Sequence, residues 1–277
     1  MHETAILRPS QPSYRSAIDG GWQLLKTQYK SLFVTIILFL ILLGLGAVAD
    51  NLLNILSPKY TDLWRVPMYL WFYLISIGFY RVLAKKLTGQ SGVLGDLFWG
   101  LKQSEAWTLA LIPAALATLV LLFSGFSVSN GQPIPPELFL QPRFWFGLLL
   151  SSLIGTFFGY VFMLYAAYGA TSKTALSNSL RIFGSKWPWL LFPYVITLFG
   201  ILIVLFFGII VGLVIGLLAF LTKLLHMLAL VKIIFSVLLV VFLLVVMLAF
   251  LIWMYGSMLI ATGALAETST RDHYRIS

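Results

Sequence analysis

The sequence predicts an all-α polytopic membrane protein, a bundle of about six transmembrane helices with short amphipathic helices at the cytoplasmic surface. Long uncharged apolar runs are the first reason, and residues 187–222 and 233–266 form the longest. Each exceeds the roughly 20 residues that cross a hydrocarbon core, and neither shows the alternation of a barrel strand. Composition is the second reason, because 60% of the residues are hydrophobic and 10% are charged. A typical soluble domain has about 25% charged residues.

Six membrane spans are predicted, at residues 32–52, 66–83, 107–126, 144–170, 187–220 and 233–261. The second is short, because only 15 uncharged residues separate Arg65 from Arg81. Its flanking arginines must reach the membrane surface, or the bilayer must thin around them. The fifth run has 36 uncharged residues, which fit one tilted helix better than two spans. Two spans would have about 16 residues each after a turn. Whether this helix is continuous or broken stays open.

We expect one transmembrane domain that occupies residues 1–277. It is divided into a polar N-terminal segment (1–12), an amphipathic interfacial helix (13–31), the six-span bundle (32–266) and a cytoplasmic tail (267–277). No cleavable signal peptide is expected, because a long, mostly polar stretch precedes the first apolar run. The absence of cysteine excludes disulfides, thiolate metal sites and palmitoylation.

The distribution of basic residues predicts the orientation. When six spans alternate sides, thirteen of the eighteen Lys and Arg residues fall on one side. The positive-inside rule places that side, and therefore both termini, in the cytoplasm. The protein is expected in the plasma membrane. The net charge of +9 then indicates a basic surface that faces the membrane, and no nucleic-acid partner is expected.

The basic loops carry short amphipathic stretches before the membrane spans. Their apolar positions are Ile18, Trp22, Leu25, Tyr29 and Leu32, then Leu94, Leu97, Phe98 and Leu101, and finally Leu176, Leu180, Phe183 and Trp187. Asp19 and Trp22 match Asp96 and Trp99 in spacing, which favours a repeat of nearly 80 residues. The alternative is that every helix that enters a membrane has Trp, Tyr and Lys at the boundary.

On either interpretation, these loops are expected to contact anionic lipid headgroups on the cytoplasmic face. The candidate interfacial residues are Trp22, Lys26, Lys30, Lys85, Lys86, Trp99, Lys102, Arg181, Lys186, Trp187 and Trp189.

Small residues at regular spacing predict close helix packing. The candidates are Ser151, Gly155, Gly159, Gly200, Gly208, Gly212 and Gly216. Lipid provides no hydrophobic drive for helices to associate, so van der Waals contact between closely approaching backbones must do so. Packing within the bundle is the simplest interpretation. One alternative is an interface with a second copy of the chain or with a membrane-protein partner. Another alternative is a hinge.

The sequence has no catalytic, cofactor or metal signature. Its histidines, His2, His226 and His273, lie outside the predicted spans, so neither an intramembrane zinc pair nor a Ser-His dyad is expected. Ionisable groups at membrane depth mark ion and proton pathways, but Asp50 and Arg81 lie near the ends of their spans. We therefore expect a protein that is not an enzyme and binds no cofactor.

Residues 17–26 (AIDGGWQLLK) and 175–180 (ALSNSL), together with the six spans, resemble uncharacterised bacterial YciC-like membrane proteins. The layout is also similar to the membrane domain attached to some bacterial glycerophosphodiester phosphodiesterases, but no phosphodiesterase domain is expected here. The resemblance implies a bacterial inner-membrane protein of unassigned function. Interfacial and packing features favour a non-enzymatic protein that organises lipids or a membrane partner. A transporter, permease or lipid-translocating protein for an apolar or lipid-like substrate is the alternative.

Overall fold

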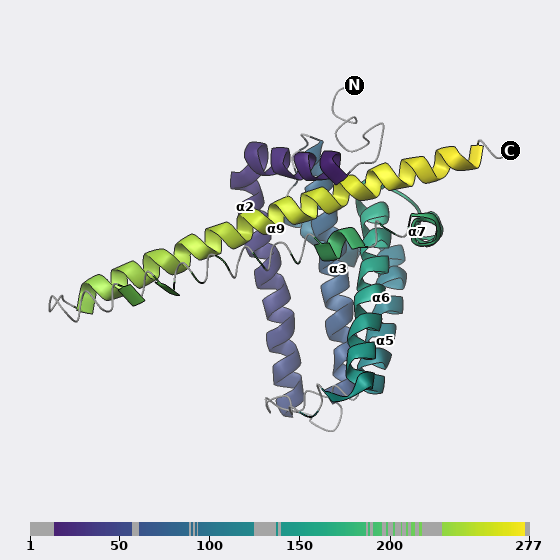
Figure 1. Cartoon of the computed structure of the whole chain (residues 1–277). Coiled ribbons are helices and arrows are strands. Elements are labelled where there is room, and N and C mark those ends of the chain that lie inside the picture. The colour runs from purple at the N-terminus through teal and green to yellow at the C-terminus, as the bar shows by residue number, and fades with distance from the viewer. Residues whose placement is uncertain are drawn as a thin grey trace.

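The computed structural model of the protein describes residues 14–56, 61–88, 94–124, 140–186 and 229–274, with some single positions and short stretches between them. In these ranges the long elements are all helices, as the fold class predicts (Figure 1). They are α2 (Tyr14–Leu56), α3 (Thr61–Leu87), the 3-10 helix η2 (Leu94–Phe98), α4 (Trp99–Lys102), α5 (Ser104–Ser124), α6 (Pro142–Tyr168), α7 (Ser172–Ser185) and α9 (Ala229–Tyr274).

Five of the described helices contain segments that are long and apolar enough to cross a membrane. These segments are Tyr14–Leu53, Trp64–Leu87, Ser104–Ser124, Pro142–Tyr168 and Val240–Gly263. They correspond to the first four predicted spans and the sixth. The fifth predicted span, residues 187–220, lies mostly outside the described residues. The described helices are therefore compatible with an integral membrane protein.

Helix α2 joins the predicted interfacial segment to the first span without a break. Its first turns lie across one end of the molecule, and the rest of the helix runs beside α3 (Figure 1). In those first turns Ala17, Gly21 and Leu24 are buried, whereas Trp22 and Tyr29 are 50% and 45% exposed. Each buried residue therefore comes one position before a residue of the predicted apolar stripe. The reason is that the small residues Ala17 and Gly21 let another helix approach.

Helix α5 runs antiparallel to α3 and α6, which run in the same direction (Figure 1). The C-terminal ends of α3 and α6, the N-terminal end of α5, helix α7 and the first turns of α2 share one end of the molecule. We call this the basic end, because most of the described Lys and Arg residues belong to it. They are Arg15, Lys26, Lys30, Arg81, Lys85, Lys86, Lys102, Lys173, Arg181 and Lys186.

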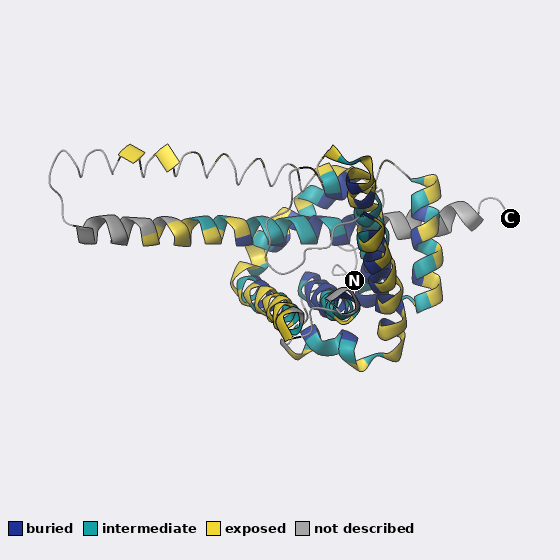
Figure 2. Ribbon diagram, turned by 90° about the horizontal axis from the view of Figure 1, so that it is seen from below, coloured by how far each residue is buried: buried dark blue, intermediate teal, exposed yellow. Residues whose placement is uncertain are grey.

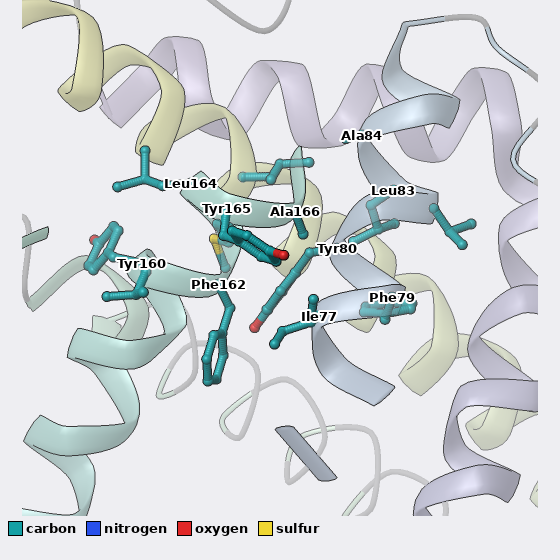
Figure 3. Close-up of a cluster of buried hydrophobic side chains, with 14 of the residues drawn as sticks. Ile77, Phe79, Tyr80, Leu83, Ala84, Tyr160, Phe162, Leu164, Tyr165 and Ala166 are labelled. Carbon is teal, nitrogen blue, oxygen red and sulfur yellow. The ribbon is translucent and has the colours of Figure 1, made fainter. Parts of the chain in front are cut away.

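The buried core lies toward the basic end. Phe39 of α2 stacks on Phe79 of α3 with ring centroids 4.3 Å apart, and Tyr255 of α9 meets Phe79 edge-on at 5.2 Å. Figure 3 shows Phe79 and Tyr80 of α3 in one cluster with buried residues of α6 such as Phe162. The exposed apolar side chains of α2, α5 and α6 lie mainly in the halves of these helices that are farther from the basic end. Those of α9 lie in its first half. In a bilayer, lipid chains cover such surfaces.

Helix α9 crosses the other long helices instead of running alongside them (Figure 1). Its first half extends away from the bundle and is largely exposed where its side chains are described (Figure 2). Its second half packs on α2, where the Trp253 Nε1–H donates to the carbonyl oxygen of Ile18 at 3.2 Å. The Tyr168 hydroxyl of α6 donates to the carbonyl oxygen of Leu259 at 2.7 Å. The predicted sixth span is therefore held by a crossing contact rather than along its length.

Candidate functional site

The basic end contains an ionic cluster where η2 and α4 fold against α3. Glycine makes this fold possible, because a Cβ on Gly78 would stand 2.5 Å from the carbonyl carbon of Leu97 and 2.9 Å from the carbonyl oxygen of Asp96. A Cβ on Gly100 would likewise collide with the carbonyl oxygen of Leu74. With no side chain at either glycine, the backbone of η2 and α4 lies directly on α3. Asp96 and its neighbours are thereby held beside the last turns of α3.

Four side chains form what we call the basic-end cluster: Arg81, Lys85, Asp96 and Trp99. The Lys85 Nζ donates to both carboxylate oxygens of Asp96, at 2.7 and 2.9 Å. The Arg81 Nε lies 3.9 Å from Asp96 Oδ1, and the guanidinium carbon lies 4.2 Å from the centre of the Trp99 ring. The Asp96 side chain is only 15% exposed. Water therefore screens these charges less than it screens an ion pair on an open surface.

The cluster has one more positive charge than negative charge, because two cations face one carboxylate. The Arg81 Nε is buried and has no hydrogen-bond partner among the described residues. Such a donor usually finds an acceptor in a native structure. A guanidinium that stacks on an aromatic ring keeps its N–H groups in the plane, where they match phosphate or carboxylate oxygens. The arrangement is suited to binding an anion.

One contact joins this cluster to α6, and a second contact joins the neighbouring helix α5 to the start of α7. The Trp99 ring packs against Tyr165 of α6, with centroids 5.4 Å apart. The Glu105 carboxylate of α5 accepts from the backbone N–H of Ser172, the first residue of α7, at 3.1 Å. A carboxylate at a helix N-terminus satisfies a free N–H and interacts favourably with the helix dipole. The cluster therefore contacts α6 directly, and α5, which packs on α3 and α6, holds the start of α7.

The structure brings two predicted interfacial residues, Lys85 and Trp99, into the cluster. Sequence reasoning missed Arg81 and Asp96 as members of a site, because it treated each charge as an isolated boundary residue. One signal was available: Arg81 and Lys85 are four residues apart, so they share one face of a helix. Their partner Asp96 follows only after a turn, and its pairing depends on the close approach at Gly78.

Other predicted interfacial residues lie elsewhere on the basic end. The Lys26 Nζ lies 5.3 Å from the centre of the Trp22 ring. Trp22 and Trp99, the tryptophans at matching positions of the suggested repeat, therefore each have a cation over the ring. The Lys30 Nζ lies 5.9 Å from the Tyr29 ring. Lys102 is exposed, and Lys86, Arg181 and Lys186 are partly exposed. Trp187 and Trp189 lie outside the described residues. Their contact with lipid stays a prediction.

The predicted packing glycines do not touch a described neighbour. A Cβ on Gly155, Gly159, Gly212 or Gly216 would meet nothing within 4 Å in the part of the chain that is described, and Ser151 is partly buried. Gly200 and Gly208 lie outside the described residues. The roles of all seven positions stay predictions.

Close approach occurs instead at glycines that the spacing rule missed: Gly21, Gly78, Gly100 and Gly256. None of them has a second glycine four residues away, although Ala17 precedes Gly21 and Ser104 follows Gly100 at that spacing. The available signal was that glycine lowers the stability of a helix relative to alanine. A glycine inside a helix therefore suggests close packing at that position.

Among the described residues, no group of three or more His, Cys, Asp or Glu side chains is placed to hold a metal ion. Comparisons with protein-family models, curated proteins and solved structures found no match to this chain. The functional assignment therefore depends on the geometry of the chain itself.

Proposed function

We propose that this chain is a multi-pass protein of the bacterial inner membrane that organises anionic lipids at its cytoplasmic face and has no enzymatic activity. The supporting observation is the Arg81 guanidinium, which stacks on Trp99 and whose buried Nε lies 3.9 Å from Asp96 Oδ1 but has no hydrogen-bond partner among the described residues. The lipid phosphate supplies the missing acceptor. The cytoplasmic leaflet is rich in anionic lipids and attracts basic surfaces beside membrane spans.

The depth of the cluster supports a headgroup rather than a soluble anion. Arg81 lies in the last two turns of the apolar segment Trp64–Leu87, so its side chain reaches the level of the membrane surface. Trp22 and Lys26 form a second indole–cation pair at the same end of the molecule, with Trp22 half exposed. Indole rings favour the headgroup region because they combine an apolar body with a polar N–H. Two such pairs at one end match a lipid surface.

Retention of anionic lipid tests the proposal. The protein is placed in nanodiscs of equal amounts of phosphatidylglycerol and phosphatidylethanolamine, and native mass spectrometry counts the lipids that remain bound. Replacing Arg81→Gln should weaken retention of phosphatidylglycerol about tenfold, since a charge-assisted hydrogen bond contributes at least 1.4 kcal/mol. Arg81→Lys keeps the charge but loses the planar fork, so it should retain an intermediate amount.

Arg143→Gln is the matched control at the opposite end, where the Arg143 Nε donates to Gln141 Oε1 at 2.6 Å. It should leave retention unchanged. Equal retention by the wild-type protein and Arg81→Gln, or equal loss in both glutamine variants, would overturn the proposal. A thermal unfolding curve for each variant separates lost binding from lost folding.

A second candidate function is lipid translocation, and the arrangement of α2 and α3 favours it. A cavity of about 380 Å³ separates these helices at the end opposite the basic end, so α2 has room to move against α3 there. Proteoliposomes that contain a fluorescent lipid in both leaflets test this function. Dithionite bleaches only the outer leaflet in passive vesicles. Bleaching that exceeds the level in protein-free vesicles indicates translocation, and unchanged bleaching removes this candidate.

A further inference from the structure

The cavity between α2 and α3 has the size of a ligand site and walls that suit a hydrocarbon chain. Its volume is about 380 Å³, and the apolar residues that line it include Leu45, Leu53 and Met68. Small-molecule sites commonly have volumes of about 300–1,000 Å³ and mostly apolar walls. Toward the basic end the two helices meet, because a Cβ on Gly46 would stand 2.6 Å from the Trp71 ring.

Two tryptophans of α3 line this cavity, and they differ in their hydrogen bonds. The Trp71 Nε1–H donates to the carbonyl oxygen of Leu42 at 2.9 Å. The Trp64 Nε1 is also buried, but it has no hydrogen-bond partner among the described residues. A buried donor without an acceptor is unfavourable, so a ligand that supplies an acceptor is favoured there. A bare hydrocarbon has no acceptor, so the ligand must combine a chain with an oxygen atom.

The charged groups near Trp64 do not determine the charge of this ligand. Asp50 lines the cavity, and Arg65, the residue after Trp64, is only 7% exposed. Both lie close enough to the Tyr69 hydroxyl to act on it electrostatically. The carboxylate and the guanidinium therefore occupy one neighbourhood and offset each other, as buried charges usually do. We therefore expect the site to select the acceptor group of the ligand and not the charge of its headgroup.

The depth of Trp64 indicates which acceptor it meets. The apolar segment of α2 ends at Leu53 and that of α3 begins at Trp64, so this indole lies where the apolar part of both helices ends. Indole rings favour that level of a bilayer. In a glycerolipid the ester groups occupy the same boundary, between the acyl chains and the headgroup. An ester carbonyl there can accept from Trp64 while its acyl chain enters the cavity along Leu45 and Met68.

We propose that this cavity binds one acyl chain of an ester-linked glycerolipid and that the Trp64 N–H donates to the ester carbonyl. The site thus selects the linkage of the lipid, whichever headgroup the lipid has. The proposal rests on the proposed function in one respect, since both require the chain to lie in a bilayer. It concerns the opposite end of the molecule and a different part of the lipid.

A pair of lipids that differ only in the linkage tests the proposal. The protein is placed in nanodiscs of equal amounts of diester and diether phosphatidylcholine with identical hydrocarbon chains, and native mass spectrometry counts each lipid that remains bound. The ether lipid has no carbonyl. The wild-type protein should therefore retain the diester lipid about fivefold better, which is the ratio that one hydrogen bond to a buried donor provides. Equal retention of the two lipids would overturn the inference.

Two tryptophan variants identify the donor. Trp64→Phe removes the N–H and keeps an aromatic ring, so it should retain both lipids equally. Trp107→Phe is the matched control, because the Trp107 Nε1–H already donates to the carbonyl oxygen of Leu101 at 3.0 Å and Trp107 does not line the cavity. It should keep the fivefold preference. An unchanged preference in Trp64→Phe, or an equal loss in both variants, would overturn the assignment of the donor.

Two alanines on α2 test the cavity itself. Ala49 lines it and Ala47 does not, and both are exposed. Ala49→Phe should lose the preferentially bound diester lipid, whereas Ala47→Phe should retain it. The opposite result, or retention in both variants, would overturn the inference. If Ala49→Phe unfolds, the smaller Ala49→Leu replaces it with the same expectation.

The Arg81→Gln variant separates this inference from the proposed function. Phosphatidylcholine has no net charge and the cavity lies far from the basic end, so Arg81→Gln should keep the fivefold preference for the diester lipid while it loses phosphatidylglycerol. A preference that disappears in Arg81→Gln and persists in Trp64→Phe would place the retained lipid at the basic end and overturn the cavity site. A preference that persists while Arg81→Gln also keeps phosphatidylglycerol would support the cavity site alone.

Discussion

A Cβ atom on Gly256 would stand 3.3 Å from the Cα of Gly21, so helices α2 and α9 cross at a pair of glycines. On the other side of the contact, a Cβ on Gly21 would collide with the Ser257 Oγ and stand 2.6 Å from the carbonyl oxygen of Trp253. Such backbone proximity replaces the hydrophobic drive that lipid does not provide. The position of α9 depends on this crossing, because its first half extends away from the other described helices.

Replacing Gly21→Leu should therefore loosen α9 from α2. Forcing a side chain into a packed contact costs about 1–3 kcal/mol, so we expect a lower unfolding midpoint in detergent or nanodiscs. Gly44→Leu on the same helix is the control, because a Cβ there would meet nothing within 4 Å. Similar midpoints for both leucine variants would contradict the crossing.

A second prediction concerns the contact that positions the basic-end cluster. Gly78→Ala places a Cβ against the backbone of Leu97, which cannot rotate away as a side chain can. We expect η2 to separate from α3 and the loop between them to become sensitive to limited proteolysis. Gly155→Ala is the control, because its Cβ would face open space among the described residues. It should leave the protein as stable or raise the free energy of unfolding by about 0.5–1 kcal/mol.

The ion pair within the cluster yields a third prediction. Lys85 and Asp96 are 27% and 15% exposed and share two hydrogen bonds. A double-mutant cycle with Lys85→Met and Asp96→Asn should give a coupling of about 1–3 kcal/mol in the free energy of unfolding. Additive effects of the two substitutions would show that the pair contributes nothing to stability.

A fourth prediction tests how α6 is tied to the chain that follows α7. The hydroxyls of Thr156 and Tyr194 are hydrogen-bonded at 2.7 Å. Tyr194→Phe should lower the free energy of unfolding by about 0.6 kcal/mol, which is typical of such a bond in a membrane protein. Tyr29→Phe is the control, because Tyr29 is 45% exposed and its only described contacts are with Phe33 and Lys30. A loss of equal size in Tyr29→Phe would contradict the assignment.

A fifth prediction concerns topology, which is open to labelling because the chain has no native cysteine. Lys102→Cys lies at the basic end and Arg143→Cys lies at the opposite end, and both positions are exposed. In sealed, oriented vesicles a membrane-impermeant maleimide should label only Arg143→Cys from the periplasmic side. Labelling of both positions from one side would overturn the proposed orientation.

Much of the helical layout could be predicted from local properties. The span predicted at residues 66–83 lies within α3, and the span predicted at residues 144–170 coincides with α6 except for its last two residues. Both could be predicted because run length and backbone hydrogen bonding depend only on the segment itself. The face of a helix that packs was harder to predict. On α7 the buried residues are Ala175, Ser179 and Ile182, whereas Leu180 of the predicted stripe is 59% exposed. In a membrane, large apolar residues face lipid as readily as protein, so hydrophobic periodicity does not identify the packed side.

By itself, the sequence determined that this chain is helical, that its helices are long and apolar enough for a bilayer, and which loops are basic. These properties follow from composition and from the hydrogen-bonding needs of the backbone within each segment. Only the tertiary structure decided that α9 crosses α2 at Gly21 and that Asp96 pairs with Lys85 and lies near Arg81. It also decided that Asp50 and Trp64 share a cavity. The physical reason is that each of these contacts joins residues on different helices, and the approach of two backbones at a glycine brings them together.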